Sequence, residues 1–403
     1  MNPLKIMFLS ALGLSGSWTM AHSAPVELDL WTIDQPGEYH YVMAREFDQQ
    51  HADITINVRT VQFRDVVNDL ARAVATGNGP DVTYIDNPDM ALFAPRHLLL
   101  DLAPYVRKSD IVDIDRIFPG PLASVRFDDS LYGLPRGSNT LALYYNADMF
   151  EAAGLDPDQP PTTWEQLYQY AKALTDSSEN VYGLAFSAIN SEEGTFQFLP
   201  WVQMGGGDYN NIATPGAKRA LTLWTRLIEE GLASRDTLIR SQYESTGTFN
   251  AGNAAMAISG PWELPRMSEE ADFNYRVAML PVPEKKAKRA SALGEGVNTI
   301  LANTRYPKEA FEFLEFMHAN MDRVWNEFGM LPASRVEVKD PNFPQAYAVF
   351  DESMKYARTR GPTPEWQKIS QTIQQAVQSA LTGQVEPAVA LENAQLKIDR
   401  ILD

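Results

Sequence analysis

Short apolar strands alternate with amphipathic helices from the start of this chain. Residues Val26–Thr32 alternate apolar and polar side chains, which predicts a strand with one wetter face. Tyr39–Gln50 carries its apolar residues on one stripe, which is typical of a helix. The strand pattern returns at Ile54–Val58, the helix pattern at Asp65–Thr76, and a third strand pattern at Val82–Ile85. This alternation predicts βαβ units, a mostly parallel sheet and the α/β fold class.

The same alternation recurs in the second half of the chain. Strands are predicted at Val181–Phe186 and Ala255–Ser259. Helices are predicted from Thr163, over Ala217–Gly231, from Pro307 to a stop at Gly329, over Trp366–Leu381, and from Pro387 onward. A chain of 403 residues is too long for one ordinary core, so two lobes are expected. Because no Gly/Ser-rich linker separates them, we expect crossing strands to join the lobes.

The first residues predict export. Lys5 supplies a positive charge, and Ile6–Leu14 is an apolar stretch that is too short to span a bilayer. Thr19–Ala21 offers small residues at the cleavage position. Residues 1–21 are therefore predicted to be a signal peptide. The chain has no cysteine, which excludes disulfides, thiol catalysis and the cysteine to which a lipid anchor is attached. An exported protein without an anchor must be retained by an outer membrane, so we expect it in the periplasm.

Composition and motifs argue against several functions. A net charge of -18 and a pI near 4.7 disfavour nucleic acid and anionic lipid as partners. The sequence has no nucleophile elbow, P-loop or dinucleotide fingerprint. Its histidines, at positions 22, 40, 51, 97 and 318, lack ligand spacing and are interpreted as ordinary surface or core residues, so we expect no metal and no cofactor. With 52 acidic residues, a carboxylate pair suited to glycoside hydrolysis remains an open alternative.

Several motifs occur in a characteristic order. Gly77–Val82 is followed by Tyr132–Pro135, then by the apolar-aromatic strand Leu141–Asn146, and finally by Gly260–Trp262. In this order they resemble the extracellular solute-binding proteins of the maltose-binding type, which are the substrate-binding subunits of bacterial sugar transporters. The resemblance covers nearly the whole mature chain. It implies a periplasmic binding protein fold, in which two α/β lobes enclose a central cleft and three hinge crossings join them, here near residues 135–141, 288–294 and 332–336.

The resemblance also implies a domain division and a function. Residues 22–137 with 288–334 would form the N-terminal lobe, and residues 138–287 with 335–403 the C-terminal lobe. The protein would be a monomer that captures a small carbohydrate by hinge closure, without chemistry, and delivers it to an inner-membrane ABC permease. A di- or trisaccharide is expected, with an α-glucoside as the first choice. The alternatives are a secreted glycoside hydrolase and a binding protein for a glycosylated osmolyte or polyol.

Aromatic residues outside regular helical stripes are candidates for stacking on a sugar. Sugars present apolar C–H faces and hydroxyl rims, so a preformed site holds them with aromatic rings and polar side chains. Three tryptophans lie in predicted Gly/Pro-rich loops and one ends a strand. The resemblance places a further aromatic residue, in a loose alignment, where a stacking ring is expected. The aromatic candidates are Trp31, Trp201, Trp262, Trp366 and Phe196.

Polar candidates come from predicted strand ends and crossings, because open α/β sheets bind ligands at the carboxyl ends of their strands. Carboxylate, amide and guanidinium groups there can hydrogen-bond sugar hydroxyls. Each also has a plain alternative as a turn or cap residue. The polar candidates are Asp34, Gln35, Asp86, Asn87, Asn139, Glu295, Asn298 and Arg360.

Overall fold

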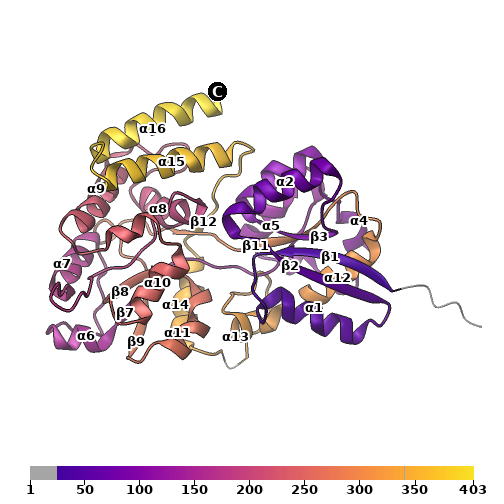
Figure 1. Ribbon diagram of the computed structural model, residues 1–403, viewed down its shortest axis with the longest axis horizontal. Coiled ribbons are helices and arrows are strands. Elements are labelled where there is room, and N and C mark those ends of the chain that lie inside the picture. The colour runs from indigo at the N-terminus through magenta and orange to yellow at the C-terminus, as the bar shows by residue number, and fades with distance from the viewer. Residues whose placement is uncertain (1–24, 340) are drawn as a thin grey trace, which may run out of the picture.

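A computed structural model describes residues 25–339 and 341–403, and its ribbon forms two bodies (Figure 1). The predicted signal peptide at 1–21 lies outside the described residues. The first body is built on a sheet with the strand order β2-β1-β3-β11-β6. β1 (Val26–Thr32) pairs in parallel with β2 (Ile54–Thr60) and with β3 (Val82–Asp86), as the alternating pattern predicts. β11 (Gly296–Ile300) joins antiparallel between β3 and β6 (Leu134–Pro135).

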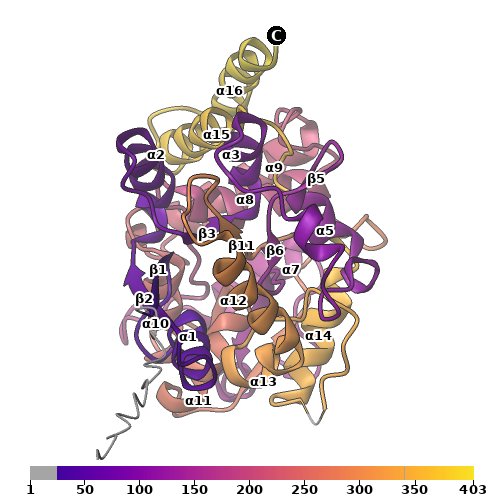
Figure 2. The ribbon, with the colours of Figure 1, turned by 90° about the vertical axis from the view of Figure 1, so that its right-hand side faces the viewer.

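Helices cover both faces of this five-stranded sheet. α1 (Tyr39–Gln50) and α12 (Pro307–Ala319) lie on one face, where Phe47 and Phe313 pack with ring centroids 5.1 Å apart, and α2 (Val66–Thr76) lies on the other (Figure 1). α12 crosses in front of β11 when this body faces the viewer (Figure 2). The apolar stripes that predicted α1 and α2 are the faces that these helices bury.

The second body has a smaller sheet. β7 (Ala142–Asn146) lies between β8 (Met256–Ser259) and β9 (Tyr275–Ala278), antiparallel to both. All five residues of β7 are buried, which explains its continuous apolar-aromatic sequence. The long helices of this body pack on one another and are α7 (Trp164–Leu174), α8 (Glu192–Met204), α9 (Pro215–Glu229), α15 (Trp366–Leu381) and α16 (Pro387–Leu402).

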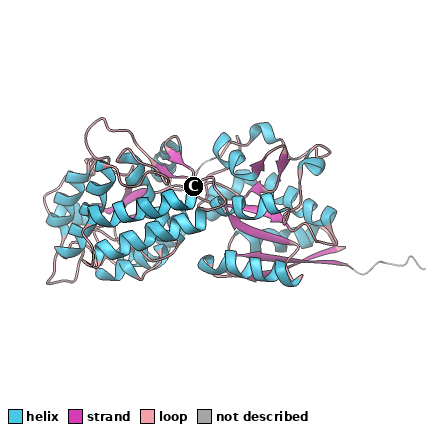
Figure 3. Cartoon of the chain, turned by 90° about the horizontal axis from the view of Figure 1, so that it is seen from above, coloured by secondary structure: helices cyan, strands magenta, loops and turns pink. Residues whose placement is uncertain are grey.

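Seen from above, the two bodies are joined by a narrow connection (Figure 3). Shorter elements complete each body. The remaining helices are α3 (Met90–Phe93), α4 (Ala103–Val106), α5 (Pro119–Val125), α6 (Ala147–Ala152), α10 (Gln242–Asn250), α11 (Leu264–Glu270), α13 (Val324–Phe328) and α14 (Pro344–Met354). The remaining strands are β4 (Arg126–Phe127), β5 (Ser130–Leu131), β10 (Ser291–Ala292) and β12 (Ala357–Arg358). Among the described residues, no helix is both long enough and apolar enough to cross a membrane.

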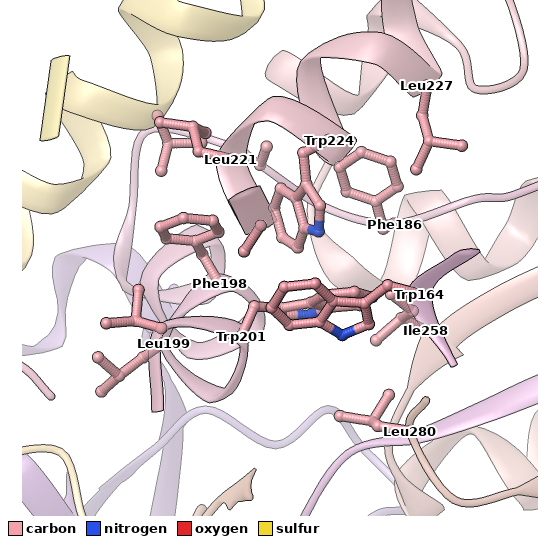
Figure 4. Close-up of a cluster of buried hydrophobic side chains, with 14 of the residues drawn as sticks. Trp164, Phe186, Phe198, Leu199, Trp201, Leu221, Trp224, Leu227, Ile258 and Leu280 are labelled. Atoms are coloured by element: carbon pink, nitrogen blue, oxygen red, sulfur yellow. The ribbon is translucent and has the colours of Figure 1, made fainter. Parts of the chain in front are cut away.

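The core of the second body is rich in aromatic residues. Trp201 and Trp224 are fully buried, and their ring centroids lie 5.8 Å apart. Trp201 also contacts Trp164, and Trp224 contacts Phe186 (Figure 4).

This packing corrects one sequence prediction. The segment around Trp201 was expected to be a loop because of Pro200 and the three glycines that follow. It is instead helix α8, which contains Pro200 in its interior and is buried over its last eleven residues. Burial on all sides outweighs the helix-breaking effect of Pro200.

Two further elements differ from their predictions. Val181–Phe186 was predicted to be a strand but makes only isolated bridges, because its amides donate to several separate segments, among them Asp176, Leu232 and Met256, and no continuous ladder forms. The helix predicted from Pro307 to Gly329 is interrupted at Asn320, and α13 follows after a 3-10 turn. Gly329 does end α13, in the left-handed conformation.

Candidate functional site

Three segments that pass between the two sheets lie side by side. The middle one connects β6 to β7. On one side, Ser138 N–H donates to the Leu331 carbonyl at 2.6 Å, and Leu331 N–H donates back to Ser138 at 2.9 Å. On the other side, Gly294 N–H donates to the Asn139 carbonyl at 3.0 Å. Side chains from these segments and from the ends of β3 and β11 therefore gather between the lobes, at what we call the junction.

Arg136, in the middle crossing segment, organises the first polar cluster of the junction. It is 7% exposed, and its Nη1 donates to Asp34 Oδ1 at 2.8 Å and to Oδ2 at 2.9 Å. Its Nε donates to Glu295, and its guanidinium carbon lies 5.1 Å from the centroid of the Tyr84 ring. Burial raises the pKa of Asp34, but the charges of Arg136 and His40 outweigh burial and hold this pKa below its ordinary value.

His40 supports this cluster from inside the first lobe. It is fully buried near the start of α1, with Nδ1 2.7 Å from Asp34 Oδ2 and also 2.7 Å from Thr32 Oγ1. Its Nε2 lies 2.8 Å from Asn298 Oδ1. Among the residues predicted for the site, Asp34 and Asn298 are thus joined through a histidine that the sequence analysis set aside. Spacing alone could not identify His40, because its partner Asn298 is 258 residues away.

Arg360 organises the second polar cluster and connects the two bodies. Its Nη1 and Nη2 donate to the two carboxylate oxygens of Asp86, at 2.7 and 2.8 Å, from the segment that precedes α15. Nη1 also donates to Glu192 Oε1 at 2.7 Å, and Nη2 donates to Asn87 Oδ1 at 3.4 Å. The parallel pairing of β12 with β10 brings this segment to the junction. Arg360 was expected to reach a ligand, but here its terminal nitrogens bind the protein's own acceptors.

Asn139 and Glu295 lie between the two clusters. Asn139 Nδ2 donates to Glu295 Oε2 at 3.0 Å, and Gly296 N–H donates to Glu295 Oε1 at 3.0 Å. Glu295 has φ 86, a conformation that side chains other than glycine adopt at an energetic cost. A Cβ on Gly294 would lie 1.9 Å from Asn139 Oδ1 and 2.8 Å from the Phe196 ring, so only glycine fits at this position.

An aromatic wall borders the polar groups. Phe196 lies 4.8 Å beneath the Arg360 guanidinium, and its ring centroid is 6.2 Å from that of Trp262. Trp262 is half-buried on a 3-10 turn, so it retains free surface. A Cβ on Gly260 would lie 1.9 Å from the indole, so the Gly260–Trp262 sequence allows the ring to fold back on its own backbone.

Four of the predicted residues lie apart from these clusters. Trp201 and Trp366 are 0% and 1% exposed and belong to the core of the second body, so in this structure they offer no surface for stacking. Trp31 is half-buried beneath Arg59, whose guanidinium carbon lies 4.6 Å from its ring centroid. Gln35 is exposed, and its N–H donates to Glu38 at 2.7 Å.

Other residues of the junction were not found from the sequence. Arg136 directly follows the Tyr132–Pro135 motif. Its positive charge within the predicted first crossing is the signal that could have identified it as a site residue. Glu192 begins α8, and Asp89 is buried beyond β3, where it accepts a hydrogen bond from Gln367 of α15. Burial, together with the charges of Asp86 and Glu192, raises the pKa of Asp89 well above its ordinary value. Within residues 25–339 and 341–403, no group of three or more His, Asp or Glu residues is placed to hold a metal.

Comparison with known proteins agrees with this architecture. The chain is 26% identical to the galactooligosaccharide-binding protein of Bacillus subtilis over 381 residues, covering 91% of this chain and 87% of that protein. It is 24% identical to the sn-glycerol-3-phosphate-binding periplasmic protein of Escherichia coli K12 over 363 residues, covering 82% and 81%. The crystal structure of an ABC transporter solute-binding protein from Thermotoga lettingae, bound with alpha-D-tagatose, superposes with a TM-score of 0.84 at 25% identity and covers 94% of this chain and 100% of that one.

These similarities confirm the predicted periplasmic binding protein fold, with two α/β lobes joined by crossing segments. The sequence model of one family, described as bacterial extracellular solute-binding protein, matches residues 32–321. That match spans more than half of the chain and includes the first two crossings and the aromatic wall of the junction. The chain therefore belongs to the bacterial extracellular solute-binding proteins.

Proposed function

We propose that this protein binds an oligosaccharide at the junction and delivers it to an inner-membrane ABC permease. A di- or trisaccharide is the expected size, and an α-glucoside is the first class to test. The observation that carries the proposal is the placement of Trp262 and Phe196 beside Asn139, Glu295 and Arg360. A half-exposed indole next to buried polar groups suits a sugar, which needs an apolar surface for its C–H face and partners for its hydroxyls.

The proposed mechanism is hinge closure. We propose the division into residues 22–137 with 288–334 and residues 138–287 with 335–403, and hinges near Gly137, Ala290 and Ala333. A ligand that touches both lobes favours the closed state by the difference in its affinity for the two states. Small-angle scattering should therefore show a smaller radius of gyration at saturating ligand. An unchanged radius at proven saturation would argue against closure.

The proposed setting is the periplasm, with residues 1–21 removed on export and the mature protein a monomer. The family to which the chain belongs supports this setting. N-terminal sequencing of the protein from a periplasmic fraction should give a start at His22 or Ala24. A retained Met1, or recovery only with membranes after a salt wash, would contradict the proposed export.

A thermal-shift screen against sugars, glycosylated osmolytes and polyols tests the ligand class. A ligand at about 100 times its dissociation constant stabilises the folded state by roughly 2.7 kcal/mol, which should raise the melting temperature measurably. Maltose and maltotriose are the first compounds to test, and lactose serves as a β-linked comparison. Release of reducing sugar from any glycoside in the panel would instead support a glycoside hydrolase. Absence of a shift with every saccharide would refute the proposed function.

A further inference from the structure

Both guanidinium groups of the junction are already neutralised by carboxylates of the protein. Arg136 binds Asp34 and Glu295, and Arg360 binds Asp86 and Glu192. Phosphate and carboxylate ligands are usually held by arginine side chains with free donors. Here the terminal nitrogens of Arg360 point to Asp86, Glu192 and Asn87, so an anion that bound these two nitrogens would have to displace one of these acceptors.

The second common anion site, a helix N-terminus, is also occupied by acidic side chains. α8 starts at the junction, and both Glu192 and Glu193 lie in its first turn. Carboxylates in that position offset the positive end of the helix dipole. The junction therefore contains more acidic than basic side chains, and an anionic ligand would meet like charge.

Buried polar atoms at the junction indicate what the ligand must supply. Within the described residues, Asn139 Oδ1 and Arg360 Nε are buried and have no hydrogen-bond partner. The two residues are 9% and 3% exposed. Asn139 Oδ1 requires a donor, whereas Arg360 Nε requires an acceptor. A hydroxyl group can play either role, but a phosphate dianion or a carboxylate can only accept.

We propose that the junction selects uncharged polyhydroxyl ligands and rejects their phosphate or carboxylate derivatives. The reason is that both arginines are already paired with carboxylates of the protein, Arg360 with Asp86 and Glu192, and Arg136 with Asp34 and Glu295. This inference rests on the proposed function and narrows it. Ligand charge varies among the relatives of this chain, since the similar E. coli protein is named for sn-glycerol 3-phosphate. On this proposal, the acidic partners of Arg136 and Arg360 are specificity-determining residues.

The test compares neutral sugars with anionic derivatives, and sugar alcohols are the neutral compounds that share the open-chain residue of the aldonates. Calorimetric titration is performed on the mature protein with maltose, maltitol and maltobionate, with lactose, lactitol and lactobionate, and with sn-glycerol 3-phosphate. At least one neutral disaccharide should bind, and its aldonate should bind at least about 100-fold more weakly than the corresponding sugar alcohol, the effect of a like-charge contact. The combined variant Glu192→Gln and Glu193→Gln removes both acidic side chains from the first turn of α8 and should reduce this ratio at least about tenfold. Glu46→Gln, on a partly exposed pair with Arg323, is the matched control and should leave the ratio unchanged.

The outcomes separate this inference from the proposed function. If the wild-type protein binds an aldonate or sn-glycerol 3-phosphate as tightly as the neutral sugar, the inference is overturned while solute binding stands. An unchanged ratio in the folded combined variant also overturns it. If no neutral saccharide of the wider screen binds, the proposed function fails and the inference fails with it. Circular dichroism checks folding, and Glu192→Gln alone replaces the combined variant if that one does not fold.

Discussion

Asp86 and Arg360 are 274 residues apart in the sequence and form a bidentate ion pair at 2.7 and 2.8 Å. Asp86 ends the strand β3 of the first lobe, and Arg360 precedes helix α15 of the second. Both side chains are at least nine-tenths buried. The pair thus fixes the lobes to each other in this structure, and it engages both terminal nitrogens of Arg360.

Replacing Arg360 by methionine should lower the free energy of unfolding strongly. The change leaves Asp86 and Glu192 buried without a cation, and removing one partner of a buried pair destabilises by about 3–5 kcal/mol. The control is Arg323→Met, whose pair with Glu46 is partly exposed and should contribute at most about 1 kcal/mol. Urea denaturation measures both variants. Equal losses would show that the Arg360 pair is no more important than a surface pair.

Replacing Trp262 by alanine should weaken sugar binding with little effect on stability. The indole is half-buried, and losing its contact with a sugar should reduce the binding free energy by about 1.5–3 kcal/mol. Trp201→Ala is the contrasting variant. Its fully buried ring packs against Trp164 and Trp224, so its loss should reduce stability by about 3–5 kcal/mol and leave the affinity of the folded protein unchanged. Calorimetric titration and chemical denaturation together distinguish the two effects, and the opposite pattern would exchange their roles.

Glu263 should make stability depend on pH. It is 1% exposed, and burial raises its pKa to about 7, more than the nearby Arg266 lowers it. Between the ordinary value of 4.5 and this value, the folded protein keeps a proton that the unfolded chain releases. The stabilising effect is therefore complete below the ordinary pKa and is lost as the pH rises through about 7, a change of about 3 kcal/mol.

Glu263→Gln removes this titration. Between about pH 5 and about pH 8 the variant should lose less stability than the wild type, by up to about 3 kcal/mol. Glu269→Gln, in the helix α11 that directly follows Glu263 but exposed, is the control and should follow the wild-type curve. Denaturation at a series of pH values provides the measurement. Parallel curves for the wild type and Glu263→Gln would show that Glu263 is ionised in the folded protein throughout this range.

Replacing Gly294 by alanine should disturb the junction itself. The new Cβ would lie 1.9 Å from Asn139 Oδ1 and 2.8 Å from the Phe196 ring, so both side chains must move. Overpacking of this kind costs about 1–3 kcal/mol, and we expect sugar affinity to fall by a similar amount because these groups border the proposed site. Gly247→Ala is the control, since its Cβ would meet only Arg266 Nη1, at 3.9 Å. Affinities measured by titration should differ between the two variants, and equal affinities would place Asn139 and Phe196 outside the site.

Local sequence determined those helices and strands whose apolar pattern lies within the element itself. The bounds of β1, α1 and α15 match their predicted ranges, because period-two and period-3.6 apolar patterns specify which face each element buries. The order of the short Gly/Pro motifs indicated the family, and the family implied the lobes and crossings. The same reasoning placed Asp34, Asp86, Asn87, Asn139 and Glu295 at strand ends and crossings, where the structure has them, whereas Asn298 lies in the middle of β11.

Tertiary structure decided what depends on distant partners. Segment 192–204 forms the helix α8, with Trp201 in the core, because it is buried against α9 and α15. The local sequence, with Pro200 and the following glycines, does not indicate this burial. The sequence proposed Arg360 as a ligand donor, and its ion pair forms with a residue of the other lobe that is 274 residues away in the sequence. Arg136 and His40 gain their roles in the same way, from Asp34, Glu295 and Asn298. Periodicity specifies which face is buried, whereas charge pairing at the junction is specified only when the chain has brought the two lobes together.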